Sequence, residues 1–230
     1  MIEEVDNDVH IQINRMPIQF SSYHSVQTPR GDYPDPPALI IATHGYGQSC
    51  KGFIKHFAPF RDKNILVVAP QGMNQFYWKN GRPGFSWMTR YMREYTISDN
   101  LDYMMQLYEN IKEKYGFDPE KVFLLGFSQG VAMAFRFASC GNIKPKGVIA
   151  CGGDLPPDTN EKLDSIEPYP VLVVHGTKDK TVVQQKGEEC IEALAKHNFP
   201  VEKHFHNEGH EIPDDTVVLI GDWIEKQLSD

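Results

Sequence analysis

The chain has 230 residues, of which 40% are hydrophobic, so it can bury a core of ordinary size without disulfides or metals to stabilise it. Its formal net charge is -8, and its 23 basic residues are scattered among 31 acidic ones, which argues against binding to nucleic acid. The first ten residues are acidic and no apolar run approaches a membrane-spanning length, so we expect a soluble, cytoplasmic protein without stable membrane insertion.

Two alternating segments open the chain. Residues 9–13 and 17–23 alternate apolar and polar side chains, which is typical of half-buried strands, and Asn14-Arg15 fits a tight turn between them. They predict an antiparallel pair at the start of a sheet. Residues 28–37 contain four prolines and a glycine, which predicts a surface loop.

Apolar runs and helical patterns then alternate along the chain. The predicted strands cover residues 38–43, 64–69, 122–125, 147–151, 170–174 and 200–206. The predicted helices cover residues 50–62, 96–115, 131–138, 182–197 and 214–228. Continuous apolar runs are typical of parallel strands that are covered on both faces. We therefore predict an α/β fold over residues 1–230, as one domain with a mostly parallel central sheet, helices on both faces and antiparallel N-terminal strands.

One long segment has neither a helical nor a strand period. Residues 70–93 contain six aromatic residues together with glycines and prolines. A long irregular segment inside a compact domain is usually functional, so we expect residues 70–95 to flank an active site. Its aromatic side chains either form a substrate wall or anchor the loop to the core, and Trp87 is the residue we expect in such a wall.

The most informative stretch is KVFLLGFSQGVAMAFRFA, residues 121–138. An apolar run ends in Gly126-Phe127-Ser128-Gln129-Gly130, and a helical pattern of small and apolar residues follows. Gly-x-Ser-x-Gly occurs by chance, but a strand before it and a helix after it are the context of a nucleophile elbow. We expect the two glycines to permit a crowded turn that exposes the hydroxyl of Ser128.

Three other strand ends carry side chains that fit the same chemistry. His44-Gly45-Tyr46 follows the first apolar run, Asp179 follows a later one, and His210 follows the last predicted strand. A serine hydroxyl needs a neutral imidazole to accept its proton, and a carboxylate to orient that imidazole. The order Ser128, Asp179, His210 is that of an α/β hydrolase. Asp154 and Glu208 are the alternatives to Asp179 as the acid.

The remaining polar groups near these loops have supporting roles. We expect the backbone N–H groups of Tyr46 and Gln129 to bind the oxyanion of a tetrahedral intermediate. His44 is expected to order its loop by hydrogen bonding, and His175 to be structural. The four cysteines lie far apart without a metal or redox spacing, which predicts buried free thiols.

These motifs together resemble the phospholipase/carboxylesterase family of α/β hydrolases, which includes the acyl-protein thioesterases. The stretches that carry the resemblance are IIATHGYG, VVAPQG, LLGFSQGVAMAFRFA, VLVVHGTKDKTV and EGHEIPDDTVVLIGDWI, from about Ala38 to the C-terminus. The resemblance implies a triad of Ser128, Asp179 and His210, oxyanion donors at Tyr46 and Gln129, and no metal or organic cofactor.

Departures from the family pattern concern the substrate rather than the reaction. Members commonly have a second glycine where this chain has Val131, Leu-Gly-Asp where it has Tyr46-Gly47-Gln48, and proline where it has Val183. Tyr46 would narrow or stiffen the acyl side of the cleft. We expect Tyr46, Trp87, Val131 and Val182 to contact the substrate.

The predicted function is a serine carboxylesterase that hydrolyses short- or medium-chain acyl esters through an acyl-enzyme. An acyl-protein thioesterase or lysophospholipase is one alternative, and an acyl-peptide or amide hydrolase is another. The alternative of a different class is a catalytically silent module that binds a small apolar ligand. The expected partner is a small acyl ester or thioester, and the sequence leaves monomer and homodimer open.

Overall fold

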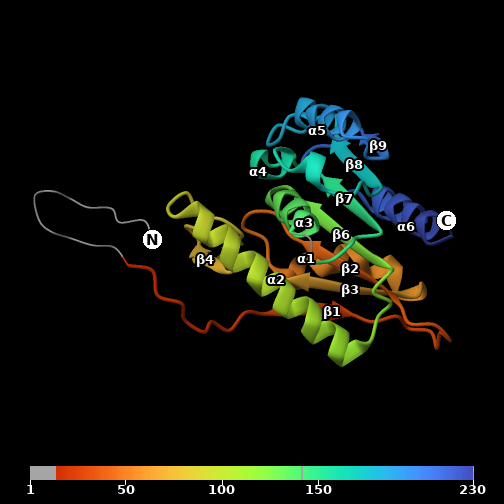
Figure 1. The fold of residues 1–230 in the computed structure, drawn as a ribbon, viewed down its shortest axis with the longest axis horizontal. Helices are drawn as coiled ribbons and strands as arrows, with labels where there is room; N and C mark the ends of the chain where they lie inside the picture. The colour runs from red at the N-terminus through yellow and green to blue at the C-terminus, as the bar shows by residue number, and fades with distance from the viewer. Residues whose placement is uncertain (1–13, 141, 230) are drawn as a thin grey trace, which may run out of the picture.

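The computed structural model describes residues 14–140 and 142–229, which build a seven-stranded sheet in the order β1-β3-β2-β6-β7-β8-β9 (Figure 1). The strands are β1 (His24–Gln27), β2 (Ala38–Thr43), β3 (Ile65–Pro70), β6 (Val122–Phe127), β7 (Gly147–Cys151), β8 (Val171–Gly176) and β9 (Val201–His206). Only β1 is antiparallel to its neighbour, β3. The predicted α/β class with a mostly parallel sheet is confirmed.

Helices cover both faces of this sheet. They are α1 (Cys50–Phe53), the 3-10 helix η1 (Ile54–Asp62), α2 (Arg93–Tyr115), α3 (Gln129–Ser139), α4 (Pro157–Asn160), the 3-10 helix η2 (Leu163–Ser165), α5 (Gln184–Lys196) and α6 (Asp214–Ser229). Side chains of a strand alternate between the two faces. In β2, Leu39 and Ile41 join the core under α2, α3 and α5, whereas Ala38 and Ile40 join the core under η1 and α6.

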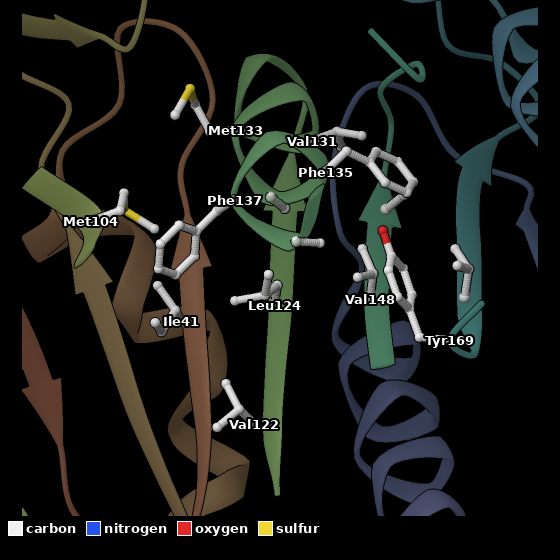
Figure 2. Close-up of a cluster of buried hydrophobic side chains, with 14 of the residues drawn as sticks. Ile41, Met104, Val122, Leu124, Val131, Met133, Phe135, Phe137, Val148 and Tyr169 are labelled. Atoms are coloured by element: carbon white, nitrogen blue, oxygen red, sulfur yellow. The ribbon is translucent and has the colours of Figure 1, made fainter. Parts of the chain in front are cut away.

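The first of these cores fixes the helix that follows the elbow. Phe135 and Phe137 of α3 lie over Ile41, Leu124 and Val148 of three neighbouring strands (Figure 2). Nine consecutive residues of α3, from 130 to 138, are buried. Because these residues face protein on every side of the helix, α3 is held rigidly, and so is the turn at its N-terminus.

The N-terminal strands differ from the prediction. Residues 9–13 lie outside the described residues, and residues 17–23 form no strand and are largely exposed, so the predicted strand over residues 17–23 is wrong. The predicted antiparallel entry to the sheet is confirmed, but β1 provides it. Pairing with β3 begins only at His24, opposite Pro70. One backbone bond continues beyond that point, from the N–H of Gln71 to the carbonyl oxygen of Tyr23 at 2.9 Å, and the next N–H, that of Gly72, donates to His44 Nε2 instead. The segment before β1 therefore runs away from the sheet (Figure 1).

The segment 70–95 is also more regular than predicted. It contains a hairpin of two four-residue strands, β4 (Asn74–Tyr77) and β5 (Pro83–Ser86), which form a separate two-stranded sheet. Strands this short give almost no periodic signal, and Pro83 belongs to a strand with an unpaired edge, where its missing N–H is tolerated. The expectation of an entirely irregular loop is wrong for these residues.

Two predicted helices differ from those in the structure, one in its type and one in its first residue. Most of the predicted helix over residues 50–62 is the 3-10 helix η1, which contains Pro59 and so cannot keep the α-helical hydrogen bonds. Helix α2 starts at Arg93, before the predicted start at residue 96, and its N-cap is Met92 with a φ of 50°. Its predicted end is confirmed, with Gly116 at the C-cap.

The cysteines follow the expectation in part. All four are free thiols; Cys50, Cys151 and Cys190 are buried and Cys140 is half-buried. None of the helices in the described part of the chain combines the length and apolar character that crossing a bilayer requires.

Candidate active site

Ser128 sits on a strained turn between β6 and α3. Its φ of 53° and ψ of −121° lie in a region that side chains rarely adopt. A Cβ atom at Gly126 would lie 2.5 Å from backbone atoms of Gly130 and Val131, and one at Gly130 would lie 2.0 Å from the carbonyl oxygen of Thr43. Only glycine fits at both positions, so the two glycines allow β2, β6 and α3 to meet at the serine.

Ser128, His210 and Asp179 form one chain of hydrogen bonds. The Oγ of Ser128 lies 2.9 Å from Nε2 of His210, and the Nδ1 of His210 lies 2.6 Å from Oδ2 of Asp179. The three residues follow the carboxyl ends of β6, β9 and β8, and the parallel sheet brings these ends to one edge. The ring of Phe127 packs beside His210 with centroids 4.9 Å apart, which limits the positions of the imidazole.

Asp179 is held in the orientation that serves His210. Its carboxylate is buried, and its second oxygen, Oδ1, accepts bonds from the N–H groups of Thr181 at 2.8 Å and Val182 at 2.9 Å. Burial alone would raise the pKa of this carboxyl, but the bonds from His210 and the two backbone N–H groups outweigh burial and lower its pKa. We therefore expect the group to be ionised at neutral pH.

The loop after β2 is ordered from its buried side by His44. Its Nδ1 lies 2.8 Å from the carbonyl oxygen of Gly45, and its Nε2 accepts from the N–H of Gly72 at 3.0 Å and from the amide of Gln71 at 2.8 Å. Burial lowers the pKa of His44 to about 4, so the ring is neutral and both nitrogens have fixed roles. The predicted ordering role of His44 agrees with these contacts.

The same loop presents a free backbone donor beside the serine. The N–H of Gly45 donates to Gln48 Oε1, that of Gly47 to Phe85 O and that of Gln48 to Gly45 O. Within residues 44–48 this leaves the N–H of Tyr46 available. A Cβ atom at Gly45 would lie 3.2 Å from Cβ of Ser128, so the loop lies directly against the elbow.

A second donor comes from the start of α3. Gln129 is the first residue of this helix, so its N–H has no acceptor within the helix. Its side chain is anchored away from the serine, since its Oε1 accepts from the N–H of Trp87 at 3.0 Å and its Nε2 donates to Ser86 Oγ at 3.0 Å. The N–H groups of Gln129 and Tyr46 are thus two backbone donors next to the elbow with no recorded acceptor among the described residues.

The hairpin of β4 and β5 supports the loop of residues 44–48 from outside. Phe85 accepts the N–H of Gly47 at 2.8 Å, and the ring of Tyr46 stacks on Phe76 with centroids 4.8 Å apart. Trp78 covers Gly47 so closely that a Cβ atom there would lie 2.3 Å from the indole. The hairpin therefore fixes both the backbone and the side chain of the loop at Tyr46.

An open cleft of about 660 Å³ adjoins these donors. Tyr46, Phe76, Ser86 and Gln129 line one part of it, and Met88, Arg90 and Arg93 line another. Within residues 14–140 and 142–229, no group of three or more His, Cys, Asp or Glu side chains could bind a metal ion. The cleft therefore opens next to Ser128 in the chain, at Gln129, and beside Tyr46.

The four residues expected to contact the substrate differ in their burial and position. Tyr46 lines the cleft and is 55% exposed. Trp87 is fully buried and its Nε1 donates to His44 O at 2.8 Å, which contradicts a wall role and favours the alternative of an anchor. Val131 is fully buried within the core of α3, which contradicts direct contact (Figure 2). Val182 is half-buried, and its backbone N–H donates to Oδ1 of Asp179.

The two alternatives to Asp179 as the acid of the triad are not hydrogen-bonded to the imidazole of His210 in the described part of the chain. Asp154 and Glu208 are exposed, and neither forms a hydrogen bond with His210 among the described residues. His175 is buried, and its Nε2 lies 2.8 Å from the carbonyl oxygen of Val182, which agrees with a structural role.

Gln71 and Ser86 were missed by the reasoning from the sequence. Gln71 binds His44 and also accepts the N–H of Cys50 at 3.0 Å, and Ser86 binds the side chain of Gln129. Gln71 follows the end of β3, so the rule that polar residues gather at strand ends could have found it. No comparable signal marks Ser86, because it belongs to the short hairpin.

Comparison with known proteins places this geometry in context. A sequence profile of the phospholipase/carboxylesterase family matches residues 24–228. A probable carboxylesterase SOBER1-like of Arabidopsis thaliana is 26% identical over 117 residues, which span 49% of this chain and only 45% of that protein.

Solved structures extend the likeness to nearly the whole chain. Esterase PE8 superposes with a TM-score of 0.72 at 21% identity, covering 90% of this chain and 99% of that one. Acyl-protein thioesterase 2 of Zea mays superposes with a TM-score of 0.69 at 19% identity, covering 90% of this chain and 100% of that one. At these identities the structures establish a shared fold.

Proposed function

Because this chain belongs to the phospholipase/carboxylesterase family of α/β hydrolases, we propose that it is a serine carboxylesterase acting on short- or medium-chain acyl esters. The observation that carries the proposal is the continuous hydrogen-bonded path from Ser128 Oγ through His210 to Asp179, with distances of 2.9 and 2.6 Å. A neutral imidazole between a hydroxyl and a carboxylate is the arrangement that generates a serine nucleophile.

In the first half of the reaction, His210 Nε2 accepts the proton of Ser128 while Oγ attacks the ester carbonyl carbon. The carbonyl oxygen becomes an oxyanion, which the N–H groups of Tyr46 and Gln129 stabilise. Asp179, ionised and oriented by its own backbone bonds, stabilises the imidazolium formed at His210. The intermediate then collapses, and His210 returns the proton to the departing alcohol, leaving an acyl group on Ser128.

In the second half, a water molecule takes the place of the alcohol. His210 accepts a proton from the water, and the resulting hydroxide attacks the acyl carbonyl in the same oxyanion site. Collapse of this second intermediate breaks the bond to Ser128 Oγ, which regains its proton from His210 and releases the carboxylic acid. The original proton of Ser128 thus leaves on the alcohol and a proton from the water replaces it, so Ser128 and His210 end the turnover in their starting protonation states.

A thioester would be cleaved by the same steps, with a thiol as the leaving group. The structural likeness to an acyl-protein thioesterase supports keeping this second candidate. The open cleft beside Tyr46 and Gln129 supports a substrate that enters from the surface, since it is not enclosed by a lid among the described residues. Ester and thioester of the same acyl group separate the two candidates directly.

The test is a series of 4-nitrophenyl esters with acyl chains of increasing length, assayed with the wild type and with Ser128→Ala. We expect turnover in the wild type and a loss of at least about a thousandfold in the variant. A matched control is Ser139→Ala at the far end of α3, where the hydroxyl only bonds back to its own helix and activity should be kept. Undiminished turnover by Ser128→Ala would overturn the proposal.

A further inference from the structure

The cleft beside the oxyanion donors has a positively charged part. Arg90 and Arg93 line it, whereas its lining contains no Asp or Glu. The positive charge of the cleft lining is opposite in sign to the formal net charge of the chain, which is -8. A cleft of one sign on a protein of the other sign creates a local field that attracts ligands of opposite charge.

Neither arginine is occupied by another group of the protein. Among residues 14–140 and 142–229, no side chain or carbonyl forms a hydrogen bond or ion pair with the guanidinium of Arg90 or Arg93. The hydrogen bonds and charge of Arg136 are the main cause of the lowered pKa of the Asp158 carboxyl, and the charge of Arg93 adds the smallest effect. That carboxylate is already held by Arg136 through two bonds of 2.7 Å each, so it leaves Arg93 free to bind another anion.

The position of Arg93 does not serve the stability of its helix. It is the first residue of α2, a helix of 23 residues, and it lies at the end that carries the positive partial charge of the helix dipole. A cation there is unfavourable for helix formation, whereas an anion bound there is favoured. The arginine side chain and the helix end therefore act on the same region with the same sign.

Substrate and arginines share one cavity. Tyr46 and Gln129, whose N–H groups face the oxyanion in the proposed reaction, line the same cleft as Arg90 and Arg93. Gln129 directly follows Ser128, so in the proposed reaction one end of an ester held at these donors would meet the cleft that carries the two unpaired guanidinium groups. Arginine recognises carboxylates through paired N–H donors.

We infer that this cleft selects acyl esters that carry a carboxylate at a distance from the scissile bond, with Arg90 and Arg93 as the specificity-determining residues. The inference rests on the proposed function, because the carboxylate is bound while Ser128 attacks the ester. Neutral esters of the same length remain substrates, but without this contact.

The test compares esters that differ only in charge. For the acyl side, mono-4-nitrophenyl adipate is paired with its neutral methyl ester; for the alcohol side, 4-acetoxybenzoate is paired with its neutral methyl ester. The double variant Arg90→Gln/Arg93→Gln is compared with Lys55→Gln/Arg61→Gln, which removes the same charge from η1, outside the cleft. Ser128→Ala gives the background rate.

In the wild type we expect kcat/KM for the charged member of one pair to exceed that of its neutral partner by about tenfold. The pair with this preference identifies whether the acyl side or the alcohol side of the ester occupies the cleft. The Arg90/Arg93 variant should abolish this preference and keep its rate on neutral esters, whereas the Lys55/Arg61 variant should keep both. Added salt should weaken the preference.

Equal rates within both pairs, or a preference that survives in the Arg90/Arg93 variant, would overturn the inference while leaving the esterase intact. Absence of Ser128-dependent turnover of all four esters would overturn the proposed function itself. If the variant unfolds, loss of rate on the neutral esters reveals it, and Arg90→Lys/Arg93→Lys then provides the comparison. This lysine variant keeps the charge and should retain a reduced preference, and a complete loss would contradict a charge-based contact.

Discussion

Replacing Asp179 with asparagine tests how the carboxylate acts on His210. In the wild type, Oδ2 accepts from Nδ1 at 2.6 Å, while Oδ1 is held by the N–H groups of Thr181 and Val182. Those two N–H donors will keep the amide oxygen of the asparagine, so its NH₂ group will face the imidazole. Nδ1 must then accept a hydrogen bond rather than donate one, and Nε2 carries the hydrogen that blocks proton transfer from Ser128.

The size of the effect follows from this geometry. At an effective dielectric constant of about 20, a carboxylate and an imidazolium with charge centres about 4 Å apart attract each other by about 4 kcal/mol. Losing this attraction in the transition state corresponds to about a thousandfold in rate. The inverted tautomer adds to the loss, so we expect kcat for an activated ester to fall by on the order of 10³ to 10⁴.

The assay is 4-nitrophenyl acetate hydrolysis by the purified variant, with Asp154→Asn as the matched control. Asp154 carries the same charge, follows β7 and is exposed, so its replacement should change kcat by less than about twofold. The reasoning is refuted if Asp179→Asn remains within about tenfold of the wild type while still folded. It is equally refuted if Asp154→Asn loses as much activity.

Three further predictions concern stability. Trp87→Phe removes the donor to the buried carbonyl of His44, so the free energy of unfolding measured by urea titration should fall by about 2 kcal/mol. The KM for an ester should stay nearly constant, and a large change in KM without a change in stability would contradict the anchor role. Gly130→Ala places a Cβ 2.0 Å from Thr43 O and should cost about 3 kcal/mol or more by the same titration, and near wild-type stability would contradict the close contact. Because the pKa of Asp179 is lowered on folding, the ionised carboxylate stabilises the fold fully above the ordinary carboxyl range, and this stabilisation is lost as pH falls from about 4 through the lower native pKa. The difference in unfolding free energy between the wild type and Asp179→Asn, measured from pH 7 down to 2, should therefore shrink in that window. A constant difference would contradict this reasoning.

The sheet and the elbow could be predicted because their signals are local. Residues 38–43 and 122–127 are buried on both faces, so the sequence there is continuously apolar. The spacing of Gly126, Ser128 and Gly130 reflects contacts within one turn, which are readable without knowing the rest of the fold. The order of strand-end residues then limits which acid and base can reach the serine.

The surroundings of the site could not be predicted, because they depend on packing between distant segments. Whether Trp87 points into the core or into the cleft is decided by an acceptor 43 residues away, the carbonyl of His44. Val131 is buried because α3 packs against the sheet on this side, and a run of mostly apolar residues does not reveal which of them faces a substrate. Residues 17–23 have a strand pattern, but β3 ends at Pro70, opposite His24, and only Tyr23 of these residues gains a backbone bond beyond it, from Gln71.

The central claim is that Ser128 is a nucleophile activated by its fold, and covalent labelling with a fluorophosphonate measures this most directly. The account predicts one adduct per chain by intact mass, located on Ser128 by peptide sequencing, absent from Ser128→Ala and from the urea-unfolded chain. It also predicts that hydrolysis of 4-nitrophenyl acetate disappears in step with labelling. Folded protein that gains no adduct, or that carries it on another residue while turnover is lost, would contradict the account.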